Sequence, residues 1–210
     1  MLDWTEYTKL FAGLLAIVNP LGIVPIFLSL TEGNSAAQRR RVALVSSLAV
    51  GIILIACLVL GSGILRAFGI TVDSFRVAGG LLLMIMAISM LYAAPSPINT
   101  TGTEQTEAEE KEDVAVVPLA IPLMAGPGAI STVIVFAQLS TSFYHYLMVS
   151  VVTVSVAVVT VTILLSAPVI GSLFGKTGMN IVTRVMGLIL AAIAVEFIAT
   201  GMLSLFPGLG

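Results

Sequence analysis

The feature of this sequence that most restricts its fold is an uncharged stretch in the second half of the chain. From Val114 to Gly175 there is no aspartate, glutamate, lysine or arginine. About 20 mostly apolar residues cross a bilayer as a helix, so this stretch predicts two spans, divided near Ser142–Leu147. Only 10% of the 210 residues are charged, whereas soluble domains average about 25%. An all-α membrane protein with several spans is therefore expected.

Charged residues bracket the first and second of the remaining predicted spans. These spans are expected near residues 8–30, 42–65, 76–94 and 180–205. The segment 95–113 is rich in threonine and glutamate and lacks apolar periodicity, so it is interpreted as a polar, acidic cytoplasmic loop. The sequence thus predicts six transmembrane helices in three parts, with a three-helix unit at 1–94, the loop at 95–113 and a second three-helix unit at 114–210.

The distribution of lysine and arginine between the loops gives the expected orientation. Six basic residues fall between or near the facing ends of the first and second, third and fourth, or fifth and sixth spans: Arg39, Arg40, Arg41, Lys111, Lys176 and Arg184. Three fall on the other side: Lys9, Arg66 and Arg76. Because the side richer in basic residues faces the cytoplasm, both termini are expected outside, in the periplasm if the cell is Gram-negative.

The two halves of the chain share sequence features in the same order. R-V-A-G-G-L-L-L-M-I-M-A-I starts at Arg76, and R-V-M-G-L-I-L-A-A-I-A-V starts at Arg184. An F-G connection precedes each, and V-N-P-L-G in the first span corresponds to A-G-P-G-A in the fourth. Because three spans per repeat is an odd number, the second copy must enter the membrane from the opposite face. The sequence predicts two inverted-topology three-helix repeats with helices 1 and 4 broken. An old duplication that kept the fold without transport is the alternative.

Four motifs together resemble the MarC family of bacterial inner-membrane proteins. They are V-N-P-L-G-I-V-P, F-G-I-T-V-D-S-F-R-V-A-G-G, V-V-P-L-A-I-P-L-M-A-G-P-G-A-I-S-T and N-I-V-T-R-V-M-G-L. The resemblance covers nearly the whole chain, and the loop at 95–113 is the part left unaligned. Some members of this family are described as transporters of small neutral amino acids such as glycine and alanine, so the resemblance implies that activity.

The two proline–glycine motifs form the predicted substrate site. Proline lacks an N–H and glycine adopts unusual dihedral angles, so each helix is expected to unwind there. N–H groups at a new helix N-terminus suit a carboxylate, and freed carbonyls suit an ammonium or a cation, so a zwitterion matches both. The predicted substrate-binding residues are Asn19, Pro20, Gly22, Gly126, Pro127, Gly128, Ser131 and Thr132. For the two hydroxyls, a bond to a carbonyl of their own helix is the alternative.

Three charged residues and one histidine complete the candidates. Glu196 lies in an apolar run and is interpreted as an ion-coupling residue that takes up a proton, or else as a carboxyl near the membrane interface. Arg76 and Arg184 begin the third and sixth spans and are candidate gating residues, with snorkelling to the interface as the alternative. His145 stands between aromatic residues and is expected in an interfacial loop.

The motifs also restrict the class of function. No nucleophile–base pair or metal-ligand spacing indicates an enzyme, and a net charge of −2 without a basic aromatic patch argues against a nucleic-acid partner. We expect a secondary transporter of small neutral amino acids in the bacterial inner membrane, coupled to H⁺ or Na⁺ and without another cofactor. A channel or exporter for another small solute and a non-transporting scaffold are the alternatives. The expected partners are the substrate and the lipid bilayer, and homo-oligomerisation is left open.

Overall fold

The computed structural model describes residues 3–92 and 124–209, and the regular structure within these ranges is helical. The elements are α1 (Trp4–Val18), α2 (Pro20–Leu30), α3 (Ala36–Ala67), α4 (Val72–Tyr92), α6 (Pro127–Ala137), α7 (Phe143–Leu165), α8 (Ala167–Leu205) and a 3-10 turn, η2 (Pro207–Leu209). Within the described ranges, five segments are long and apolar enough to cross a membrane: Trp4–Leu30, Ala36–Ala67, Val72–Tyr92, Phe143–Leu165 and Thr177–Leu205.

These five segments correspond to the first, second, third, fifth and sixth predicted spans. The fourth predicted span is represented among the described residues by α6, which has 11 residues. The predicted loop at 95–113 lies outside the described residues. The expectation of an all-α membrane protein is confirmed, whereas the arrangement as two inverted repeats stays a prediction.

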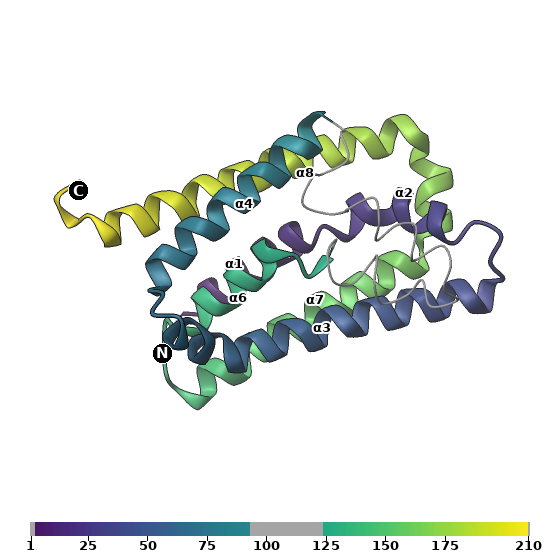
Figure 1. Ribbon diagram of the computed structural model, residues 1–210. Coiled ribbons are helices and arrows are strands. Elements are labelled where there is room, and N and C mark those ends of the chain that lie inside the picture. Colours follow the sequence, from purple (N-terminus) through teal and green to yellow (C-terminus); the bar gives the residue numbers. More distant parts are fainter. Residues whose placement is uncertain (1–2, 93–123, 210) are drawn as a thin grey trace.

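The helices form three layers (Figure 1). α1, α2 and α6 lie in the middle, with the pair α4 and α8 on one side and the pair α3 and α7 on the other. Apart from Pro127, Ile130 and Phe136, every residue of α6 is buried. Irregular backbone at membrane depth is tolerated only where protein or water surrounds it. The middle layer, which is covered on both sides, is therefore where helix ends are accommodated.

Glycines let α4 and α8 approach closely. A Cβ atom would lie 3.0–3.1 Å from a backbone oxygen of the other helix at three positions: Gly80 against Ala194, Gly187 against Ala87 and Gly201 against Asp73. The partner numbers fall along α8 as they rise along α4, so the two helices are antiparallel. Small residues are the usual means of close helix packing in membranes, where apolar burial adds little between helices.

The two F-G connections of the sequence share a backbone conformation. Gly69 follows α3 with φ 67°, and Gly175 interrupts α8 with φ 58°. Both values lie in the left-handed region that glycine adopts without steric cost. Gly175 separates the first segment of α8 from the spanning segment that begins at Thr177, and Gly171 in that first segment packs against Leu28 of α2. The fifth and sixth spans are therefore joined by a short helical elbow, visible in Figure 1.

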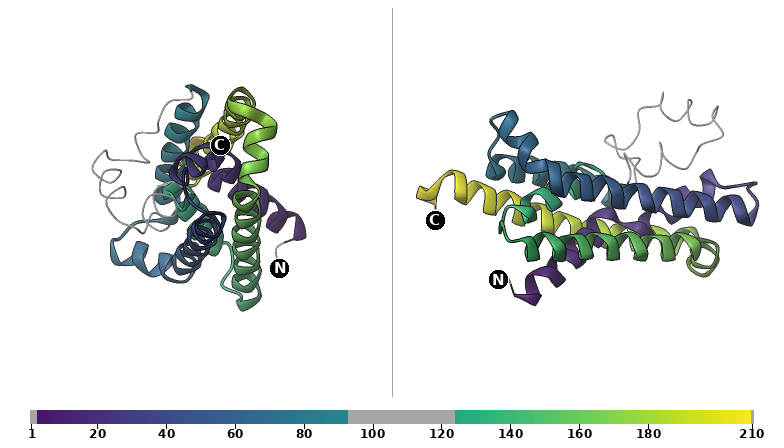
Figure 2. Two further views of the ribbon diagram at one scale, coloured as in Figure 1. Left: turned by 90° about the vertical axis from the view of Figure 1, so that its right-hand side faces the viewer. Right: turned by 90° about the horizontal axis from the view of Figure 1, so that it is seen from below.

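Both ends of the described chain lie at the same end of the bundle (Figures 1 and 2). An even number of membrane crossings requires this arrangement. Which face of the membrane the termini occupy stays a prediction from the distribution of basic residues.

Candidate functional site

The first span is broken at Asn19. This residue adopts φ 48° and ψ 57°, and it is the one non-glycine residue with positive φ in the described part of the chain. Its N–H donates to the Leu15 carbonyl and so closes α1, while its side-chain Oδ1 accepts from the Gly22 N–H at 3.2 Å and caps α2. Asparagine tolerates the left-handed region better than most residues because its short side chain bonds locally. The predicted break of helix 1 is confirmed.

Pro20 and Gly22 fit the geometry of this break. Pro20 is the first residue of α2, where its missing N–H would have no helical partner in any case. A Cβ atom at Gly22 would lie 2.8 Å from the Asn19 Cγ, so glycine makes room for the capping carboxamide. On the other side of the break, the last α1 carbonyls, those of Ala16, Ile17 and Val18, accept no hydrogen bond from any described residue.

The second predicted break lies where α6 begins, inside the bundle. Gly126 precedes the helix and is buried, and Pro127 is its first residue. Glycine offers no side-chain cap, and the N–H groups of Gly128 and Ala129 have no acceptor among the described residues. The N-terminus of a helix carries a partial positive charge. Residues 93–123 lie outside the described part of the chain, so a helical half before this break stays a prediction.

The end of α1 and the start of α6 lie against each other. A Cβ atom added to Gly128 would overlap Leu83 of α4 and lie 3.4 Å from the Ile17 Cγ2 in the last turn of α1. The last turn of α1 carries carbonyls without a described partner and a partial negative charge, whereas the first turn of α6 carries N–H groups without a described partner and a partial positive charge. Opposite partial charges thus adjoin in the interior of the bundle.

Helix α4 contacts the residues at both breaks. The Asn19 Nδ2 lies 3.8 Å from the Met90 Sδ, and a Cβ atom on Gly79 would lie 2.6 Å from the Ser131 Oγ. The Thr132 hydroxyl donates to the carbonyl one turn earlier in α6 at 2.8 Å, so for this residue the backbone-bond alternative is confirmed. The eight predicted binding residues therefore fall at two helix junctions that share α4 as a wall.

The charged candidates do not lie at the breaks. Ala194 and Ile198 of α8 face Gly80, and Glu196 midway between them is exposed on the opposite side of that helix. Arg184 is exposed as well. The proposed coupling and gating roles of these residues stay predictions.

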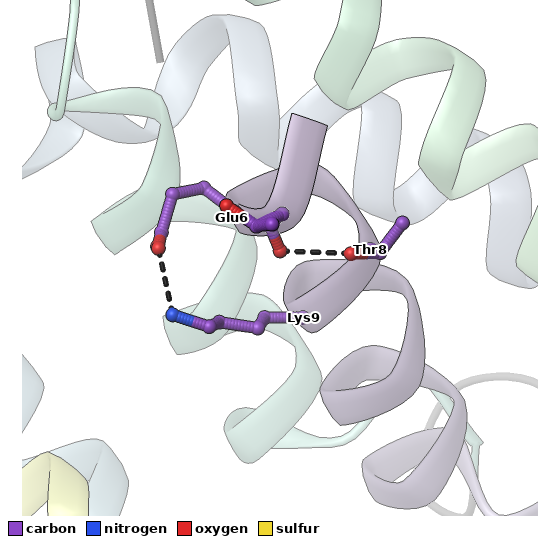
Figure 3. A network of polar contacts seen from close by, with 4 residues as sticks. Glu6, Thr8 and Lys9 are labelled. Carbon is purple, nitrogen blue, oxygen red and sulfur yellow. Dashed lines mark hydrogen bonds and ion pairs between the residues drawn. The ribbon is translucent and has the colours of Figure 1, made fainter. Parts of the chain in front are cut away.

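Two ion pairs involve described residues, and both join neighbours on one helix. The Arg76 side chain is 15% exposed and its NH1 lies 4.0 Å from the Asp73 Oδ1. At the start of α1 the Lys9 Nζ lies 2.8 Å from the Glu6 Oε1 (Figure 3). Pairs of this kind are screened by solvent and contribute little to stability. In the described part of the chain, charge pairing therefore does not hold one helix against another.

A buried histidine joins three helices at the far end of α6. His145, near the start of α7, is 2% exposed. Its Nε2 lies 2.8 Å from the Phe136 carbonyl oxygen in α6, and its Nδ1 lies 3.0 Å from the Tyr7 hydroxyl in α1. A carbonyl only accepts, so Nε2 carries the hydrogen, and in the neutral imidazole the Tyr7 hydroxyl donates to Nδ1. The expected loop position of His145 is wrong, because the residue lies in the first turn of α7. The two ring contacts fix the C-terminal end of α6 and hence the position of its N-terminus.

Comparison with known proteins gives full-length similarity. Residues 4–206 match a protein family described as "MarC family integral membrane protein". UPF0056 membrane protein YhcE of Escherichia coli (strain K12) is 42% identical over 207 residues, which cover 99% of this chain and 96% of the relative. UPF0056 membrane protein YvbG of Bacillus subtilis (strain 168) is 40% identical over 198 residues, 94% of each chain. UPF0056 membrane protein MJ1677 of Methanocaldococcus jannaschii is 36% identical over 201 residues, 95% of this chain and 97% of the relative. No solved structure matches.

Proposed function

The chain belongs to the MarC family of integral membrane proteins, and on that premise we propose that it is a secondary transporter of small neutral amino acids in the bacterial inner membrane. The observation that carries this proposal is the contact between the last turn of α1 and the first turn of α6, where Gly128 lies against Ile17. Interrupted helices that meet in the middle of a bundle are the common form of a transporter's substrate site.

The chemistry of the two helix ends favours a zwitterion. The N–H groups of Gly128 and Ala129, which have no acceptor among the described residues, are donors for a carboxylate. The carbonyls of Ala16 and Ile17, which have no donor in the part of the chain that the structure describes, are acceptors for an ammonium group. A solute that carries no charged group would leave both the N–H groups and the carbonyls poorly matched, and buried polar groups without partners are costly. An α-amino acid carries both charges two bonds apart, on a scale that suits two adjacent helix ends.

The packing around Gly128 favours a small side chain. Leu83 from α4 and Ile17 from α1 both contact this glycine, and a single added methyl group would overlap Leu83. A substrate side chain of one hydrogen or one methyl group, as in glycine or alanine, is compatible with such a site. Leu83 must move for the substrate to enter, so α4 is the proposed moving wall.

Matching features in the two halves support alternating access. α2 begins at Pro20 and α6 begins at Pro127. Gly69 and Gly175 share positive φ values in the matching F-G connections. In the proposed mechanism these halves are inverted repeats, and movement of one against the other opens the site to each side in turn. Glu196 takes up the coupling proton in this scheme. An ionisable group within a span is energetically costly, so its presence there indicates a function.

The test is uptake of labelled glycine or alanine into proteoliposomes, with and without imposed H⁺ or Na⁺ gradients. We expect saturable uptake that Gly128→Ala abolishes. Gly13→Ala in α1 is the matched control, because a Cβ atom there meets no atom within 4 Å, and it should leave uptake unchanged. Uptake that never saturates and ignores both gradients would indicate a channel. Absence of uptake for every small amino acid would indicate another solute or a scaffold.

A further inference from the structure

A groove runs along the membrane-facing side of α3 and α7, away from the helix breaks. It has a volume of ≈ 800 Å³, and its walls are apolar except for Ser47. Small residues hollow it out: a Cβ atom on Gly51 of α3 would still lie 3.4 Å from the Ala157 Cβ of α7. A second hollow of ≈ 530 Å³ shares Leu44 and Val45 with the groove and continues it to the start of α3. Together they form one extended groove along the surface of the bundle.

Two arginines line the end of this extended groove that lies at the start of α3. Arg40 and Arg41 are exposed, and neither has a hydrogen-bond or ion-pair partner among the described residues. Their neighbour Arg39 differs, because it donates to the Thr31 hydroxyl and carbonyl, each at 3.3 Å. Arg40 and Arg41 therefore present two uncommitted guanidinium groups beside an apolar groove.

The length of α3 places these arginines at the depth of lipid headgroups. Arg41 and Arg66, near opposite ends of α3, are separated by about 38 Å at 1.5 Å rise per residue. A bilayer measures about 40–45 Å with its headgroup regions and about 30 Å without them. When α3 spans the bilayer, Arg41 and Arg66 lie in opposite headgroup regions. The part of the groove from Leu48 to Leu60 then lies within the hydrocarbon.

A buried hydroxyl stands between the arginines and the apolar groove. Ser47 is 0% exposed, lines the groove, and its Oγ is the buried side-chain polar atom without a hydrogen-bond partner in the described part of the chain. Buried hydroxyls normally have a partner. Ser47 is about 9 Å along the helix from Arg41 at 1.5 Å per residue. In a glycerophospholipid the ester carbonyls, which only accept hydrogen bonds, lie between the phosphate and the acyl chains. The order of phosphate, ester carbonyl and acyl chain matches the order of arginines, Ser47 and apolar groove.

We infer that this extended groove is a binding site for one anionic phospholipid of the surrounding membrane. Arg40 and Arg41 bind the phosphate and the negative headgroup, Ser47 donates to an ester carbonyl, and one acyl chain lies between α3 and α7. Arginine is well suited to phosphate because its guanidinium forms paired hydrogen bonds. A second copy of the chain fits this face less well, because a two-fold contact here would bring the same arginines of both copies together.

The experiment measures lipid-dependent stability of the purified protein in detergent, with phosphatidylglycerol and phosphatidylcholine of identical acyl chains. We expect phosphatidylglycerol to raise the unfolding temperature more than phosphatidylcholine does. The double variant Arg40→Gln/Arg41→Gln should lose this difference, Arg40→Lys/Arg41→Lys should keep most of it, and the control Arg66→Gln at the opposite end of α3 should keep all of it. These side chains are exposed, so all three variants are expected to fold.

A second variant tests the acyl chain. Ala56 lines the groove and is exposed, so Ala56→Phe should fill the groove and reduce the number of lipids retained in native mass spectrometry by one. Three results would overturn the inference: equal stabilisation by both lipids, a preference that survives Arg40→Gln/Arg41→Gln, or a preference that Arg66→Gln removes equally well. Cross-linking of two copies through Ala56→Cys in a Cys57→Ser background, regardless of the lipid added, would assign the face to a dimer instead.

Discussion

Replacing Asn19 separates the two roles that this residue has at the break of the first span. Alanine at this position must adopt the left-handed backbone conformation, which costs about 1–2 kcal/mol for a residue with a Cβ atom. It also loses the side-chain cap on the Gly22 N–H, worth about 1 kcal/mol. Asn19→Ala should therefore lower the free energy of unfolding by about 2–3 kcal/mol, as the sum of these terms.

Glycine at the same position is the matched comparison. It adopts the left-handed conformation freely, and replacing a capping residue by glycine costs only a few tenths of a kcal/mol. Both variants lose the contact with the Met90 Sδ, so that loss cancels between them. Reversible unfolding in mixed micelles, followed by circular dichroism, measures the difference. If Asn19→Ala and Asn19→Gly unfold at the same denaturant concentration, the backbone argument for the break is refuted.

Three further variants test the packing and the coupling. Tyr7→Phe removes the donor to the buried His145 Nδ1 and should lower the free energy of unfolding by about 1–3 kcal/mol, and an unchanged unfolding curve would contradict the buried hydrogen bond. Gly128→Ala should stop uptake because the new methyl group overlaps Leu83, and Leu83→Ala in the same chain should restore part of it, whereas a double variant as inactive as the single one would argue against this contact as the cause. Glu196→Gln should abolish proton-driven accumulation and leave exchange intact, and full accumulation in this variant would remove Glu196 from the mechanism.

Five of the predicted membrane spans coincide with long apolar helices, and they were predictable because apolar runs are local properties of the sequence. Their ends were less predictable, since helices continue beyond the hydrocarbon core. The second span was expected near 42–65 and α3 extends over Ala36–Ala67. A local signal for its true start does exist: Ser35 and Gln38 form a capping box with reciprocal hydrogen bonds.

The break of the first span was also predictable, because the missing N–H of Pro20 acts on its own helix. What surrounds the break was not. The contact of α4 with both junctions and the bond between Tyr7 and His145 join residues far apart in the sequence. No periodicity or spacing encodes such contacts, and an aromatic neighbourhood is as typical of an interface as of a buried cluster.

In the proposed site, two adjoining helix ends bind the two charges of one amino acid. Equilibrium binding of labelled alanine to the purified protein, with competition by propionate and ethylamine, tests it most directly. Propionate keeps the carboxylate and ethylamine keeps the amino group. We expect that unlabelled alanine displaces the label and that neither analogue does so at the same concentration. Displacement by one analogue as effective as that by alanine, or a failure of alanine to bind, would contradict it.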